Sequence, residues 1–60
     1  MAVSVQDITV ALHEGDALLC YKNALVEVDH HTHRLLIYCD NDQLVSFDIA
    51  EVKEWLMRLD

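Results

Sequence analysis

Alternating hydrophobic and polar residues in the second half of the chain predict a β-hairpin. In VEVDHHTHRLLIY, Asp29 can accept hydrogen bonds from turn N–H groups, and Thr32 can do so more weakly. A loop of residues 30–33 places His33 at the left-handed position, which histidine tolerates. Asp29 then faces Arg34, and one face of the hairpin carries four apolar residues. These are Val26, Val28, Leu35 and Ile37.

A second turn, CDNDQ, precedes another alternating segment. Val45, Phe47 and Ile49 alternate with Ser46 and Asp48. A turn with an odd number of residues puts Val45 and Phe47 beside Ile37 and Leu35, whereas an even turn reverses the faces. We therefore expect a three- or five-residue turn around Asn41. The turn lacks the glycine and the later ligands of an EF-hand calcium loop.

The pattern changes period in FDIAEVKEWLMRL, which predicts a C-terminal α-helix. Asp48 is a suitable N-cap and Glu51 completes a capping box. Glu54 and Arg58 have the spacing of an exposed i,i+4 ion pair. The predicted apolar stripe consists of Ile49, Val52, Leu56 and Leu59, with Trp55 at its edge.

The first half permits two interpretations. The segments ITVALH and ALLCYK flank HEGD and suggest a hairpin. Asp16 could instead cap a helix through ALLCYKNAL, whose residues are good helix formers. We favour the strand. The expected fold is therefore α+β: an antiparallel meander of four to five strands, open or curled into a partial barrel, with a C-terminal α-helix.

The other face of this predicted sheet is also apolar. It would carry Leu25, Leu36, Tyr38 and Leu44, and one short helix cannot cover both faces of a sheet. Either the sheet curls into a small barrel or another molecule covers this face. The apolar excess favours a homodimer or an obligate partner.

Length and charge narrow the class of protein. The chain has 60 residues, which is enough for a single small domain spanning residues 1–60. Eleven acidic residues against four basic ones give a formal charge of −7. Such a surface repels nucleic acids and anionic membranes, and it favours a protein partner with a basic surface. Alternatively, the acidity only keeps a hydrophobic chain soluble.

The cysteines and the N-terminal sequence predict a cytoplasmic protein. MAVSVQDI has no basic segment followed by an apolar core, so no signal peptide is expected. Cys20 and Cys39 lack the spacing of a redox or zinc motif, and we expect two reduced thiols that pack as small hydrophobic residues.

Candidate chemistry is sparse. His30, His31 and His33 lie close together, and His31 with His33 is a weak candidate for metal binding. Neighbouring residues of a tight turn point in divergent directions, so we predict no metal site and no cofactor. Neither cysteine is placed beside a histidine by any motif, and no glycine-rich loop is present. We therefore expect no enzymatic activity.

These observations suggest a non-enzymatic interaction module. The predicted role is that of a stoichiometric inhibitor or accessory factor for a basic, nucleic-acid-handling complex. By composition alone, it is comparable to phage- or mobile-element-encoded inhibitors of CRISPR or transcription complexes. The alternatives are a metal- or pH-responsive regulator that uses residues 30–33, and a structural subunit of a larger assembly. The expected interface comprises Leu25, Leu36, Tyr38, Leu44, Asp40, Asp42, Glu51 and Glu54.

Overall fold

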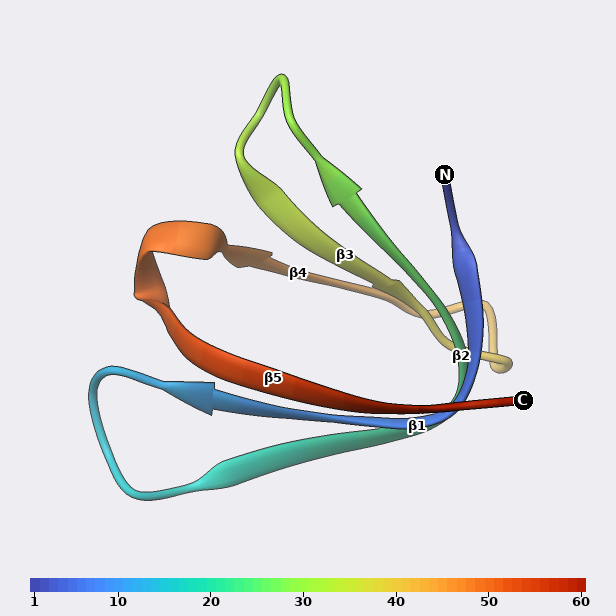
Figure 1. The fold of residues 1–60 in the computed structure, drawn as a ribbon, viewed down its shortest axis with the longest axis horizontal. Coiled ribbons are helices and arrows are strands. Elements are labelled where there is room, and N and C mark those ends of the chain that lie inside the picture. The colour runs from blue at the N-terminus through green and yellow to red at the C-terminus, as the bar shows by residue number, and fades with distance from the viewer.

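The computed structural model describes residues 1–60 as a single antiparallel sheet of five strands (Figure 1). In chain order the elements are β1 (Val3–Leu12), β2 (Leu18–Asp29), β3 (Arg34–Tyr38), β4 (Leu44–Asp48), the 3-10 turn η1 (Ile49–Glu51) and β5 (Val52–Leu59). The strand order is β4-β3-β2-β1-β5. Strands β1 to β4 are therefore joined by three successive hairpins, and β5 returns to pair with β1. The protein is all-β.

The predicted α+β class is wrong, because the C-terminal α-helix does not form. Asp48 does act as an N-cap, and its carboxylate accepts a hydrogen bond from the backbone N–H of Ala50 at 3.0 Å. The helical turn ends at Glu51, however, and Val52–Leu59 is extended. The free edge of β1 supplies hydrogen-bond partners to this segment along almost its whole length. Those bonds replace the ones that a helix would make within itself.

The predicted hairpins and their registers are confirmed. Asp29 pairs with Arg34, and Val26 pairs with Ile37. Five residues, Cys39–Gln43, separate the paired Tyr38 and Leu44, which gives the odd turn that the pattern required. In the first half β1 and β2 form the favoured hairpin, and the alternative helix beginning at Asp16 is absent.

A corner divides the sheet into two layers. Val5 and Ile8 are both fully buried, although strict alternation would place them on opposite faces of β1. The change of face occurs at Gln6, where the β1–β5 register shifts, and opposite it at Asn23, which has a φ of +54°. Such irregularities bend strands sharply. Figure 1 shows β3 and β4 in one layer, β1 and β5 in the other, and β2 running through both.

The turn η1 joins the layers on the side opposite the corner. The N–H of Ile49 donates to the carbonyl of His33 at 3.1 Å, in the layer of β3 and β4. The N–H of His13 donates to the carbonyl of Glu51 at 3.0 Å, in the layer of β1 and β5. The sheet is thus curled into a partial barrel.

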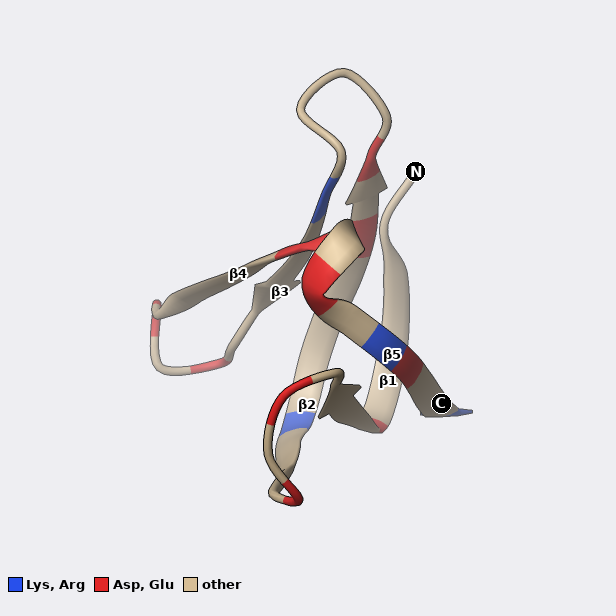
Figure 2. Cartoon of the chain, turned by 90° about the vertical axis from the view of Figure 1, so that its left-hand side faces the viewer, with Lys and Arg blue, Asp and Glu red and all other residues tan.

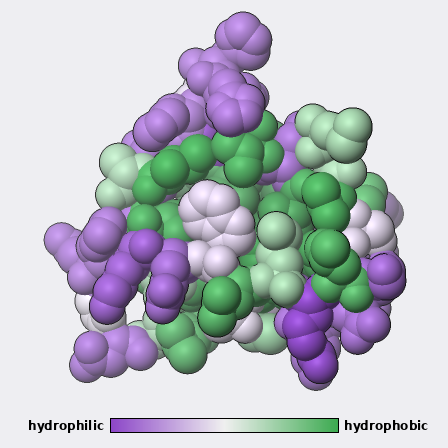
Figure 3. Space-filling view, viewed as in Figure 1, coloured by the Kyte–Doolittle hydropathy of each residue, from purple (hydrophilic) through white to green (hydrophobic).

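The core lies between the layers and is small. Eight residues are buried: Val5, Ile8, Val10, Ala24, Val26, Leu35, Ile37 and Val52. Across it, the rings of Tyr21 from β2 and Phe47 from β4 lie 6.4 Å apart and tilted by 55°, a favourable geometry for an aromatic pair. Burial raises the pKa of the Tyr21 hydroxyl, and the thiol of Cys39 adds to this effect. Figure 3 shows hydrophobic residues in the middle of one side and hydrophilic residues around them.

Candidate protein-interaction surface

A row of exposed apolar side chains crosses the outer side of the layer formed by β3, β4 and the second half of β2. Leu25 pairs with Tyr38, and Tyr38 pairs with Leu44 on its other side. Their exposed fractions are 46%, 39% and 53%. We call this outer surface the acidic face, for the charges described below. The predicted placement of these three residues on one face is therefore confirmed.

Leu36 occupies the neighbouring row of the same face. It lies between Glu27 of β2 and Ser46 of β4, and its side chain is half-buried. Beyond it, Nε of Arg34 donates to Oγ of Ser46 at 2.5 Å. The apolar surface therefore has its most exposed part at the end nearest the β3–β4 turn.

A shallow pocket of about 330 Å³ adjoins the apolar row at that end. Leu25 and Tyr38 contribute its apolar lining, and Asp40 and Asp60 contribute carboxylates. Oγ of Ser4 donates to Oδ2 of Asp60 at 2.5 Å, which orients that carboxylate. The complete lining is Ser4, Asn23, Ala24, Leu25, Tyr38, Cys39, Asp40 and Asp60.

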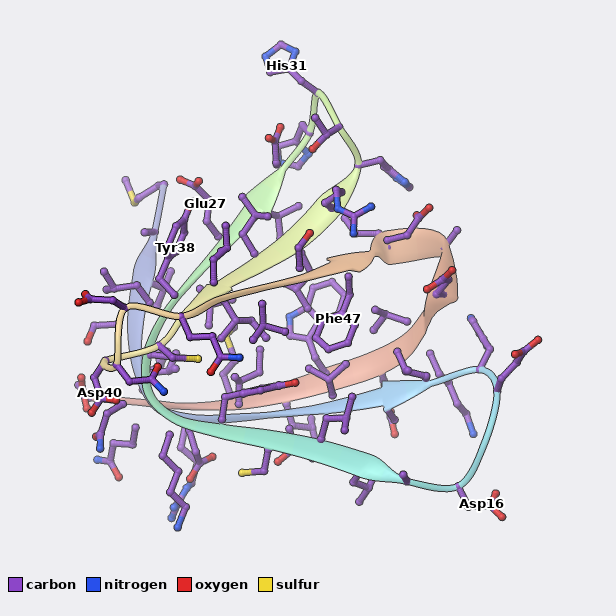
Figure 4. The ribbon with its side chains drawn as sticks, turned by 180° about the vertical axis from the view of Figure 1, so that it is seen from behind. Asp16, Glu27, His31, Tyr38, Asp40 and Phe47 are labelled. Atoms are coloured by element: carbon purple, nitrogen blue, oxygen red, sulfur yellow. The ribbon has the colours of Figure 1, made fainter.

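The surroundings of this pocket are acidic. Asp40 and Asp42 lie in the β3–β4 turn, which contains no Lys or Arg, and Figure 2 shows acidic positions there. In Figure 4, Tyr38 and Glu27 lie on the same outer side, with Asp40 at the end of the layer. Arg34 is the one Lys or Arg in β3, β4 and their connecting turn, and it lies at the opposite end of β3 from Asp40. A ligand in the pocket would therefore meet a negative potential.

Two residues of the predicted interface lie elsewhere. Glu51 belongs to η1 and lines a separate hollow of about 300 Å³ with Leu12, His13, Glu14 and Ala50. Glu54 is on β5, paired with Ala11, in the other layer. The structure thus groups Leu25, Leu36, Tyr38, Leu44, Asp40 and Asp42, and separates Glu51 and Glu54 from them.

The histidine turn adopts the predicted conformation. Oδ1 of Asp29 accepts the N–H of His31 at 2.9 Å and that of Thr32 at 3.3 Å. These bonds stabilise the ionised carboxylate and lower the pKa of Asp29. His33 has a φ of +59°, and Figure 4 shows His31 projecting from the tip of the hairpin. No three His, Cys, Asp or Glu side chains are grouped so that they could hold a metal ion.

A second exposed apolar surface lies on the outer side of the other layer, and we call it the opposite face. Leu18 and Leu56 are 67% and 69% exposed there. Cys20 is a free, exposed thiol, so the expectation that it packs as a small hydrophobic residue is wrong. The expected C-terminal helix concealed this face, because it placed Leu56 in a helical stripe. The alternation of Leu18, Cys20 and Lys22 with Leu19 and Tyr21 was the available signal.

Comparison of the chain with protein-family models, with curated proteins and with solved structures finds no match. The structure has no helix that is long and apolar enough to cross a membrane.

Proposed function

We propose that the chain is a non-enzymatic interaction module that binds a basic protein through its acidic face. The observation that supports this is the exposed row Leu25–Tyr38–Leu44, which leads into a pocket with two carboxylates. Exposed apolar side chains beside a polar rim are typical of protein interfaces. Tyrosine is also among the residues that contribute most to binding at such surfaces.

The pocket suits an arginine or lysine side chain of the partner. The aliphatic stem would pack against Leu25 and the ring of Tyr38, and the charged end would reach the carboxylates of Asp40 and Asp60. A cation over the tyrosine ring adds an electrostatic attraction. The acidic face therefore provides both an apolar contact and a charge that selects a basic partner.

Charge determines which partners are favoured at this face. Two copies of the acidic face would bring like charges together, and nucleic acid would meet the same repulsion. Proteins that handle nucleic acids present basic surfaces, so we propose a stoichiometric inhibitor or accessory factor of such a complex. A phage or mobile-element origin belongs to the same proposal and rests on composition alone.

An arginine-containing peptide tests the site. We would titrate the isotope-labelled protein with an acetylated peptide of alternating arginine and leucine, and follow its amide NMR signals. We expect the largest changes at Leu25, Tyr38 and Asp40, and a weaker response to a matched peptide with glutamine in place of arginine. Changes spread evenly over the surface, or the same affinity for both peptides, would contradict the proposed site.

Variants test which residues contribute to binding of the arginine peptide. The double variant Asp40→Asn, Asp60→Asn should weaken binding of the arginine peptide by about tenfold or more, since charged hydrogen bonds contribute about 1.5–3 kcal/mol each. Tyr38→Ala should also weaken it, while Glu54→Gln, on the opposite face, serves as the control. Equal losses from Glu54→Gln and Asp40→Asn would indicate a general effect of net charge instead of a site.

A further inference from the structure

The opposite face has three rows of side chains that cross strands β2, β1 and β5. The first row is Lys22, Asp7 and Arg58; the second is Cys20, Thr9 and Leu56; the third is Leu18, Ala11 and Glu54. The adjacent residues of β1, Ile8 and Val10, are fully buried on the inner side. The three rows therefore point outward, and no element of the chain covers them.

Charge is distributed unevenly along this face. Lys22 and Arg58 occupy the first row, where Arg58 forms an ion pair with Asp7. Glu54 lies in the third row, and the β1–β2 turn beyond it carries Glu14 and Asp16. Figure 2 shows these acidic positions at the turn and the basic position on β2. One end of the opposite face is thus basic, the other is acidic, and the middle is apolar.

We propose that a second copy of the chain packs on the opposite face, about a two-fold axis that runs along the row Cys20–Thr9–Leu56. This axis turns the basic end of one copy onto the acidic end of the other, which is the charge complementarity that a symmetric contact requires. Arg58 of each copy then lies over Glu54 of the other copy. The aliphatic stem of Lys22 in each copy covers Leu18 of the other copy, and the ammonium group of Lys22 points toward Asp16 of that other copy.

The same axis places each residue of the middle row opposite its own equivalent. Thr9 and Ala11 on the central strand are small, so two sheets can approach to the usual spacing of about 10 Å. Leu56 then packs against Leu56, and the two Cys20 thiols face each other at the border of the contact. Three short rows bury less area than a standard interface, so we expect a weak dimer that is in equilibrium with the monomer.

The opposite face suits a second copy better than the acidic face does. Two of the four Lys and Arg residues of the chain, Lys22 and Arg58, lie on the opposite face, whereas Arg34 is the one Lys or Arg in β3, β4 and their connecting turn. The acidic face lies on the other side of the molecule and stays accessible in the dimer. This inference is independent of the partner proposed for the acidic face.

Charge reversal tests the pairing of Arg58 with Glu54. Sedimentation over a range of concentrations should show a monomer–dimer equilibrium in the wild type. Arg58→Glu and Glu54→Arg should each raise the dissociation constant by about tenfold or more, and the double variant should restore dimerisation. Circular dichroism would establish that each variant is folded, and Asp40→Lys on the acidic face is the matched control. A monomer at millimolar concentration, or a double variant weaker than either single one, overturns the proposal.

Cross-linking tests the position of the axis without any charge change. A short bismaleimide should join two wild-type copies through Cys20, at concentrations where the dimer is populated. Cys39→Ser, which retains Cys20, should cross-link as well as the wild type, and Cys20→Ser should give no covalent dimer. A covalent dimer that persists in Cys20→Ser and disappears in Cys39→Ser would place the contact on the other side of the molecule and refute this axis.

Discussion

Asp7 and Arg58 face each other across β1 and β5, and Nε of Arg58 donates to Oδ2 of Asp7 at 2.7 Å. The hydrogen bond and the charge of Asp7 raise the pKa of Arg58. In the predicted helix Arg58 would instead have paired with Glu54. The ion pair is thus a direct consequence of the C-terminal segment being a strand.

Replacement of Asp7 should cost a modest amount of stability. Because Arg58 is largely exposed, we expect Asp7→Ala to lower the free energy of unfolding only modestly, and by less at high salt. Urea denaturation of dilute protein at two salt concentrations measures this. A double-mutant cycle of Asp7 with Arg58 should show coupling, and one of Glu54 with Arg58 should show none. The reverse result would favour the helix.

The N-cap at Asp48 should contribute to the stability of the protein, although the 3-10 turn that it caps is short. Asp48→Ala removes the acceptor of the Ala50 N–H, and we expect a loss of about 0.5–1 kcal/mol in the free energy of unfolding. Asp48→Asn retains a side-chain oxygen and should lose less. Thermal and chemical denaturation measure both variants, and equal stability of Asp48→Ala and wild type would show that the cap contributes nothing.

Asp29 should make the stability of the protein depend on pH in the acid range. Hydrogen bonds from His31 and Thr32 hold the pKa of Asp29 below its ordinary value of 3.8. A folded-state pKa below the unfolded value stabilises the protein above the unfolded pKa, and this contribution is lost as pH falls through the folded pKa. An NMR titration should therefore give a midpoint below 3.8 for Asp29. Asp29→Asn should show less acid destabilisation than wild type; greater acid sensitivity would contradict the assignment.

His33 should tolerate glycine. Its φ of +59° is a conformation that costs other residues energy and that glycine adopts freely. We expect His33→Gly to be neutral or to stabilise the protein by up to about 1 kcal/mol, measured by the denaturation midpoint. His31→Gly, at the tip of the same turn, is the control and should not stabilise. A clear loss of stability in His33→Gly would mean that the imidazole itself stabilises the turn.

The two central hairpins could be predicted from sequence because their determinants are local. Asp29 accepts the N–H groups of the turn, and His33 adopts the positive φ that the turn requires. The alternation around Val26 and Ile37 permits only one register, since a slip of one residue would expose the core. The exposed positions of Leu25 and Tyr38 follow from that register. The acidic residues of the β3–β4 turn were equally predictable, because they are adjacent in sequence.

The C-terminal segment and the division into two layers depended on tertiary structure. In Val52–Leu59 the apolar residues fit a helical stripe as well as a strand with a bulge, so the pattern alone could not choose. The strand is favoured because it pairs with the free edge of β1, whose backbone groups would otherwise stay unpaired. The corner at Gln6 and Asn23 likewise arises from the curling of the sheet around Val5 and Ile8, which no local signal specifies. Sequence therefore determined the hairpins and the acidic, apolar outer face, whereas long-range strand pairing determined the fifth strand and the separation of Glu51 and Glu54 from that face.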